Sequence, residues 1–297
     1  RVGGRVISKP RPNAMPMKAL WRLLRTLREC FEFQDDAELA IEVDPRRLVP
    51  LQCGELAAMG FNRVSLGVQD IEPRVQAEIG RHQTAHETSK AVNEARAAGF
   101  QAVNVDLVYG LNGQTIASIE STVESVVDLR VDRVALFGFA YLPQARPNQR
   151  KLTASTLPDA HARIALEASA RQLFLDAGYL PVGIDHFALP HDPLARARED
   201  RHLHRTFQGY TPFTPTDTIG LGVSAISNIQ GAMTQNAKRL SDYRVAIESD
   251  RFATERGLFI SDDDQRRARI IDALMCYGEF SWSNVVPNTA EPLWDVY

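Results

Sequence analysis

The stretch Arg63-Val64-Ser65-Leu66-Gly67-Val68-Gln69 decides the fold class of this chain. Its valines and leucine alternate with small or polar residues, so a strand built from it is apolar on one face only. The runs Leu39 to Asp44 and Ala102 to Tyr109 repeat this alternation, and Arg133 to Leu142 also has strand character. Helix-like stretches lie between these runs. The alternating order of strands and helices predicts a parallel sheet with helical crossovers.

Polar side chains near the ends of these strands favour a βα (TIM-like) barrel over an open sheet covered on both faces. A sheet buried under helices on both sides should be apolar on both faces. In this chain one face carries Glu42, Gln69 and Asp106. Ligand-binding residues of a barrel collect at the carboxyl ends of its strands, so we expect these three to converge on one site. The alternative is that such carboxylates cap the following helices, as we expect Asp44 before Pro45 to do.

Three helix ends share a pattern of a small residue or methionine, then glycine, then an aromatic residue. They are Met59-Gly60-Phe61, Ala98-Gly99-Phe100 and Ala177-Gly178-Tyr179. Glycine at such a position adopts the left-handed conformation that ends a helix, and the aromatic residue opens the next segment. The pattern therefore predicts where three of the crossover helices end.

The chain divides into three parts by composition. Residues 1–16 hold four cations, no acidic residue and several prolines, and are predicted to be a disordered or foreign tail. Residues 17–250 carry an opening amphipathic helix and the strand and helix units. Residues 251–297 are predicted to be a C-terminal helical domain that is truncated.

Charge and composition indicate a small-molecule partner. The net charge of −3 and the pI near 6.2 give no field that would hold the chain on nucleic acid or on a membrane. No apolar run approaches the roughly 20 residues that span a bilayer. Three scattered cysteines argue against a disulfide framework, and His82 and His86 lack a third ligand for a metal. We expect a cytoplasmic protein with no metal ligands of its own.

Five segments, taken in order, resemble the oxygen-independent coproporphyrinogen III oxidases. They are Ile41-Glu42-Val43-Asp44-Pro45, Gly60 to Asp70, Asn104 to Leu111, Asp185-His186-Phe187-Ala188 and Phe207-Gln208-Gly209-Tyr210. The likeness runs from about Met17 to near Cys276, and the ordered series of motifs is specific to this family.

The resemblance implies a fold and a reaction. The fold is an incomplete βα barrel of the radical S-adenosylmethionine (SAM) type, followed by a small helical domain. The family holds two SAM molecules and a [4Fe-4S] cluster, and an electron donor reduces SAM to a 5′-deoxyadenosyl radical. Two propionates of coproporphyrinogen III then become vinyl groups, which gives protoporphyrinogen IX in heme biosynthesis. We expect a monomer with a tetrapyrrole substrate.

The resemblance also implies cofactor-binding positions, although it assigns no catalytic residue. Matched to SAM-binding positions are Glu42, Gln69, Arg81, Asp106, Ala140, Phe207 and Ile226. Glu42 and Asp106 would accept hydrogen bonds from hydroxyls or the amine, and Arg81 suits a carboxylate. From the bare pattern, Arg81 reads as a surface cation. Phe207 and Ile226 would line the part of the site that holds the adenosine.

The chain departs from the family at its start. It contains no CxxxCxxC motif, and Lys9-Pro10-Arg11-Pro12 stands where the family carries GGGTP. We therefore predict that the first two barrel strands and the cluster ligands are missing, and that this chain alone is inactive. Two alternatives remain open, a radical-SAM-like heme-binding chaperone and a non-catalytic remnant. The segments Asp185-His186-Phe187 and Phe207 to Tyr210 fit the oxidase branch better than the chaperone branch.

Overall fold

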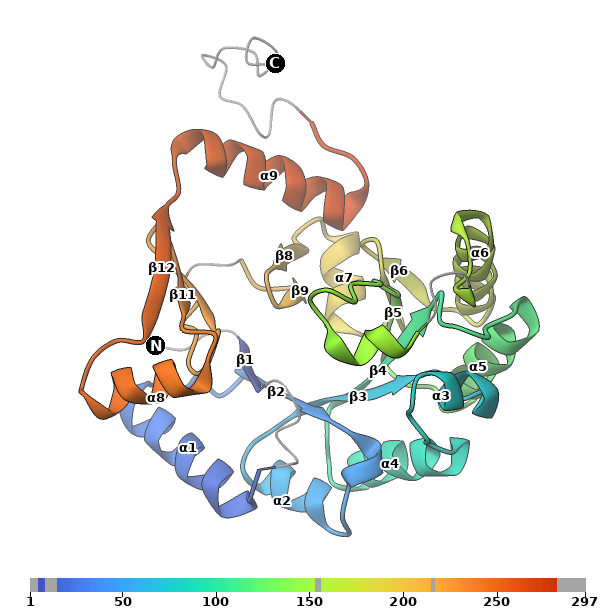
Figure 1. Cartoon of the computed structure of the whole chain (residues 1–297), viewed down its shortest axis with the longest axis horizontal. Helices are drawn as coiled ribbons and strands as arrows, with labels where there is room; N and C mark the ends of the chain where they lie inside the picture. Colours follow the sequence, from blue (N-terminus) through green and yellow to red (C-terminus); the bar gives the residue numbers. More distant parts are fainter. Residues whose placement is uncertain (1–4, 9–14, 153–155, 215–216, 282–297) are drawn as a thin grey trace. The chain divides into compact units, whose positions relative to one another are not determined.

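The computed structural model describes residues 5–8, 15–152, 156–214 and 217–281. They belong to two compact units, Arg1–Arg196 and Ala197–Tyr297. Figure 1 shows the elements coloured along the sequence. Among the described residues, no helix has the length and the apolar content needed to cross a bilayer.

The first unit is built on one seven-stranded sheet. Its strands are β1 (Arg5–Ser8), β2 (Glu38–Val43), β3 (Arg63–Gln69), β4 (Ala102–Tyr109), β5 (Arg133–Gly138), β6 (Leu180–Val182) and β7 (His186–Ala188). They are ordered β1-β2-β3-β4-β5-β7-β6, with β1 to β5 parallel and with β7 and β6 antiparallel to their neighbours. The predicted α/β class with a parallel sheet is confirmed. The described strands form an open sheet, without closure into a barrel.

Helices lie between the strands of this sheet or follow them along the chain. They are α1 (Met17–Cys30), η2 (Pro45–Arg47), α2 (Gln52–Ala58), α3 (Pro73–Glu78), α4 (Ala85–Ala97), α5 (Ile116–Asp128), η3 (Pro147–Lys151), α6 (Ala160–Asp176) and α7 (Pro193–Glu199), the last crossing the boundary between the units. In Figure 1, α1, α2 and α4 lie along one side of the sheet. Their apolar residues, such as Leu20, Leu56 and Val92, pack with the sheet in one core.

The alternation of the strand residues is confirmed by their burial. Val64, Leu66 and Val68 of β3 are buried, whereas Ser65, Gly67 and Gln69 between them are half-buried. The burial of β4 alternates in the same way through Asp106. One face of the sheet is therefore closed by the core, and the other face remains partly accessible for a site.

Residues at the helix ends determine where the predicted helices begin and end. The glycines after three helices have left-handed φ values of 96°, 90° and 85°, at Gly60, Gly99 and Gly178. Phe61, Phe100 and Tyr179 after them are buried. The side chain of Asp44 accepts a hydrogen bond from the backbone N–H of Arg46, so the expected cap before Pro45 is present. These ends follow from residues adjacent in sequence, which is why the sequence predicts them.

Part of the predicted disordered or foreign tail forms a strand. Arg5–Ser8 forms β1, which pairs in parallel with β2 from Arg5 opposite Glu38 to Ser8 opposite Ile41. A four-residue strand at a sheet edge is too short to show a periodic pattern, and its pairing partner lies some 30 residues later in the chain. Residues 1–4 and 9–14 of the predicted tail, and residues 282–297 of the predicted C-terminal domain, lie outside the described residues.

The second unit holds two small antiparallel sheets and two helices. The hairpin joins β8 (His204–Thr206) to β9 (Gly209–Thr211), and the second sheet joins β10 (Ile226–Ile229), β11 (Ala232–Asn236) and β12 (Thr254–Phe259). The helices are α8 (Leu240–Glu248) and α9 (Asp262–Tyr277), and α9 lies within the residues predicted to form a helical domain. The unit begins at Ala197, whereas the predicted C-terminal domain begins at 251, and the short strands β8 to β11 lie between these two positions.

Candidate functional site

The accessible face of the sheet gathers polar side chains around Gly67 of β3. In the register of the sheet Gly67 lies opposite Asp106 of β4. The register shifts after Gly67, and Gln69 at the strand end has a left-handed φ of 73°. A Cβ placed on Gly67 would lie 3.1 Å from Nε2 of Gln69 and 3.6 Å from Nη2 of Arg81. Gln69, Arg81 and Asp106 therefore meet at one glycine that leaves them room.

Arg81 is held at this point by three acceptors of the first unit. Its Nη2 donates to the backbone carbonyl of Gly67, to Oε1 of Gln83 at 3.0 Å and to Oδ1 of Asp44 at 3.3 Å. The side chain is only 12% exposed. Burial alone would raise the pKa of Asp44, but its hydrogen bond to Arg46 and the charges of Arg81 and Arg46 lower that pKa. The guanidinium of Arg81 is thus oriented by the ionised carboxylate of Asp44. Arg81 is therefore not a surface cation, which the sequence pattern without the family resemblance had suggested.

Asp106 accepts hydrogen bonds at both carboxylate oxygens. Ser65 Oγ donates to Oδ2 at 3.0 Å, and Asn104 Nδ2 donates to Oδ1 at 2.8 Å. Glu42 of β2 lies opposite Ser65 in the register, on the same half-buried face. Ser65 thus lies beside Glu42 in the register and donates to Asp106, which is paired with Gly67 two residues further along β3. Neither Ser65 nor Asn104 was selected from the sequence, although both alternate onto the polar face.

A buried polar network holds the segment that presents Gln69 and Arg81. Asp70, with none of its surface exposed, accepts from Gln114 Nε2 at 2.6 Å and from Thr122 Oγ1 at 3.0 Å. Burial raises the pKa of Asp70, against these hydrogen bonds. Gln76 Nε2 donates to the carbonyls of Asp70 and Gln83, and Gln76 Oε1 accepts from the N–H of Gln83. Because the partners lie up to 52 residues apart, only the tertiary structure reveals this support.

The other three predicted positions follow β5 or belong to the second unit. Ala140 follows β5, is exposed, and accepts a hydrogen bond at its carbonyl from Gln149. Phe207, 74% exposed, sits between β8 and β9, and Ile226 opens β10. Both belong to the second unit. The arrangement around Gly67 thus concerns Glu42, Gln69, Arg81 and Asp106, and a shared role for all seven residues stays a prediction.

The cysteines of the described residues do not form a metal centre. Burial raises the pKa of Cys53 to about 11 and that of Cys276 to about 12, while Cys30 is exposed at the end of α1. A thiolate, not a thiol, is the metal ligand, so raised pKa values disfavour binding. No group of three or more His, Cys, Asp or Glu side chains that could hold a metal ion occurs in the described ranges.

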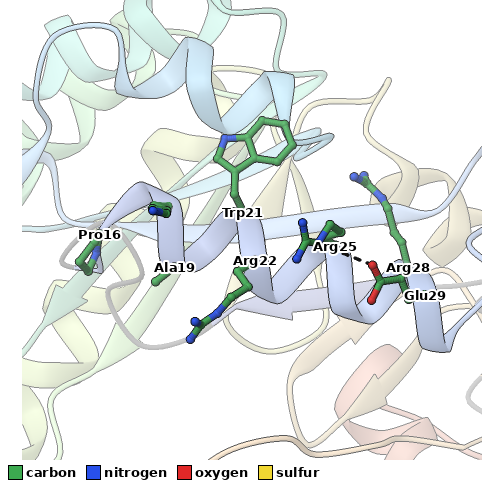
Figure 2. A pocket seen from close by; sticks show the side chains of 8 residues that line it. Pro16, Ala19, Trp21, Arg22, Arg25, Arg28 and Glu29 are labelled. Carbon is green, nitrogen blue, oxygen red and sulfur yellow. Dashed lines mark ion pairs between the residues drawn. The ribbon is translucent and has the colours of Figure 1, made fainter.

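A hollow of about 690 Å³ lies along α1 (Figure 2). Its lining includes Pro16, Ala19 and Trp21 together with basic side chains of the same helix. One of these, Arg25, forms an ion pair with Glu29 at 3.6 Å. None of the predicted site residues lines this hollow, so its location does not coincide with the polar cluster around Gly67.

Comparisons with known proteins give a consistent result. Residues 6–126 match the model of the radical SAM superfamily. The oxygen-independent coproporphyrinogen III oxidase of Pseudomonas aeruginosa is 39% identical over 276 residues, which are 92% of this chain and 60% of that protein. The Escherichia coli enzyme of the same name is 37% identical over 286 residues, 96% of this chain and 62% of its own length.

The likeness extends to a solved structure. The structure of coproporphyrinogen III oxidase (HemN) from Escherichia coli, described as a radical SAM enzyme, superposes with a TM-score of 0.91 at 37% identity. The alignment covers 95% of this chain and 65% of that one. This chain therefore spans about three fifths of the length of the curated relatives it matches.

Proposed function

Since this chain belongs to the radical SAM superfamily and is homologous to the oxygen-independent coproporphyrinogen III oxidases, we propose that its first unit binds SAM for the oxidative decarboxylation of coproporphyrinogen III. The observation that carries the proposal is the meeting of Gln69, Arg81 and Asp106 around Gly67, with Glu42 one strand away. Two SAM molecules, an electron donor, a cytoplasmic location and a monomeric state belong to the same proposal and rest on the family alone.

The chemistry of these side chains suits SAM. A SAM site needs hydrogen-bond acceptors for ribose hydroxyls or an ammonium group, and a cation for the carboxylate. Glu42 and Asp106 offer carboxylate oxygens, and the amide of Gln69 both donates and accepts. Arg81 contributes positive charge, while its contacts with Asp44 and Gln83 keep the guanidinium in place. When bound in such an enzyme, SAM supplies the group that removes a hydrogen atom from the substrate.

The described residues do not fit the family's [4Fe-4S] cluster. Such a cluster needs several thiolates close together, whereas Cys53 and Cys276 are buried with raised pKa values and belong to different units. The role proposed for this chain is therefore binding of SAM and of the substrate, without a cluster held by its own cysteines.

Iron and sulfide analysis tests this misfit directly. After anaerobic reconstitution, we expect the 297-residue chain to retain far less than one [4Fe-4S] cluster per molecule, because its three cysteines are scattered along the sequence and no suitable group of metal-binding side chains occurs in the described part of the chain. The Cys53→Ser variant should retain as little metal as the unchanged chain. A stoichiometric cluster with its charge-transfer absorption would contradict the expectation.

Calorimetric titration with S-adenosylhomocysteine and with SAM tests the proposed function. We expect the unchanged chain to bind both, and Glu42→Ala to bind them about 10- to 100-fold more weakly, since a hydrogen bond to a charged group is lost. The matched control is Glu124→Ala, which removes an exposed carboxylate from α5. If the unchanged chain binds neither compound, the proposal is overturned.

A further inference from the structure

An arginine of α6 lies across two glycines at the carboxyl ends of β4 and β5. A Cβ placed on Gly110, directly after β4, would lie 3.2 Å from Nε and 3.4 Å from Cγ of Arg163. A Cβ placed on Gly138, the last residue of β5, would lie 3.2 Å from Nη2 of the same side chain. A larger residue at either position would press against the guanidinium or its stem. The two glycines therefore leave the space that Arg163 occupies.

A tyrosine hydroxyl meets this guanidinium at Gly138. Tyr109 is the last residue of β4 and is paired with Gly138 in the register. The same Cβ position on Gly138 lies 3.0 Å from the hydroxyl of Tyr109, so this hydroxyl and Nη2 of Arg163 converge on one point. Gly138 and its neighbour Phe137 are exposed, whereas Tyr109 and Arg163 are half-buried. Solvent therefore reaches the backbone beside which the two hydrogen-bond donors meet.

Neither of these polar groups has a partner within the ranges that the structure describes. The guanidinium of Arg163 makes no ion pair or hydrogen bond there, and the hydroxyl of Tyr109 makes no hydrogen bond. By contrast, Arg171 of the same helix pairs with Glu167 at 2.7 Å. Arg163 also lies near the amino end of α6, where the helix dipole favours anions, so its charge does not stabilise its own helix. A guanidinium and a hydroxyl whose donors meet at one exposed point suit an oxyanion.

From this geometry we infer that Arg163 and Tyr109 bind a side-chain carboxylate of the tetrapyrrole substrate. The inference rests on the proposed function and adds a substrate contact to it. The planar guanidinium donates hydrogen bonds to the carboxylate, and the hydroxyl donates another. Ligands of such folds bind at the carboxyl ends of the strands. Asp106 lies three residues earlier on β4, about 10 Å away, and a tetrapyrrole with four acidic arms is wider than this distance.

The carboxylate of SAM has the same chemistry as the acidic arms of the substrate. One cation, Arg81, is already present beside Gly67, among the residues proposed to bind SAM. SAM carries a single carboxylate, whereas coproporphyrinogen III carries four. A second cationic site at the same edge of the sheet is therefore assigned to the substrate.

Two titrations separate these sources of the carboxylate. The fluorescence titration uses coproporphyrin III, the stable oxidised form of the substrate, and the calorimetric titration uses S-adenosylhomocysteine. We expect Arg163→Met to weaken coproporphyrin binding by about 10-fold or more, because hydrogen bonds to a charged group are lost, and to leave S-adenosylhomocysteine binding unchanged. Arg163→Lys, which keeps the charge, should recover part of the affinity. Tyr109→Phe should weaken coproporphyrin binding by about 3- to 10-fold.

Arg171→Met is the matched control, because it removes a cation of the same helix that already pairs with Glu167. It should alter neither titration. If Arg163→Met fails to fold by circular dichroism, Tyr109→Phe decides in the same two titrations. Weaker binding of S-adenosylhomocysteine alone would assign the carboxylate to SAM and overturn the inference, as would equal loss for both ligands or no loss for either.

These failures leave the proposed function standing, because that function is tested by binding of both compounds to the unchanged chain. If the unchanged chain binds S-adenosylhomocysteine and not coproporphyrin III, the proposed substrate and this contact are both overturned, while the proposed binding of SAM stands.

Discussion

Replacing Asp192 by alanine is expected to destabilise the protein by about 3–5 kcal/mol, because removing one partner leaves buried charges uncompensated. The Asp192 side chain has no exposed surface. Its Oδ1 lies 2.7 Å from Nη2 of Arg133, and its Oδ2 lies 3.3 Å from Nη2 of Arg63. Whole proteins are stable by about 5–15 kcal/mol, so this loss is a large share. Urea denaturation followed by circular dichroism measures it.

The control for this variant is Glu167→Gln on α6. Glu167 forms a partly exposed ion pair with Arg171 one helical turn away, at 2.7 Å. Such pairs contribute about 0.5 kcal/mol or less. If both variants lower the free energy of unfolding equally, the expected large contribution of the buried Asp192 ion pairs to stability is contradicted.

The pH dependence of stability gives a second check on Asp192. Burial alone would raise its pKa, but the guanidinium groups of Arg133 and Arg63 hold that pKa below its ordinary value. A carboxyl whose pKa is lower in the folded state stabilises the protein above its unfolded pKa of about 3.9. That stabilisation is lost as the pH falls through the folded pKa. The acid-induced loss of stability should therefore be smaller in Asp192→Ala than in the unchanged chain.

Gly67→Val is expected to weaken binding of S-adenosylhomocysteine by at least about 100-fold while the fold is retained. A Cβ on Gly67 would lie 3.1 Å from Nε2 of Gln69, and the two further methyl groups of valine would fill the space in front of Arg81. Gly67 is in the middle of β3 without a positive φ, and valine is favoured in strands. Calorimetric titration gives the affinity, and a melting curve reports stability.

Gly54→Ala serves as the matched glycine control. A Cβ on Gly54, within α2, meets nothing within 4 Å. Alanine there should raise stability by about 0.5–1 kcal/mol, because glycine loses more backbone entropy in a helix, and ligand affinity should be unchanged. Normal binding by Gly67→Val would mean that the ligand does not occupy the space around that glycine.

The strands β3 and β4 could be predicted to their end residues, because alternation of side chains is a local property. The strand predicted from Arg133 to Leu142 ends earlier, at Gly138. The strands β6 to β9 were not predicted, since each has three residues and is too short to show a period. The sequence alone predicted only part of the candidate site. The polar strand face indicated Glu42, Gln69 and Asp106, whereas Arg81 was identified only through the family resemblance.

Local pattern alone determined the α/β class, the polar face of the sheet and the glycine-terminated helices, because each depends on residues within one or two turns of one another. Only the tertiary structure decided that β1 joins the sheet, that Arg81 rests on Gly67 and Asp44, and that Asp192 pairs with Arg63 and Arg133. These contacts join residues separated by up to 129 positions. Strand register and crossovers bring such side chains together, and no short-range pattern encodes that meeting.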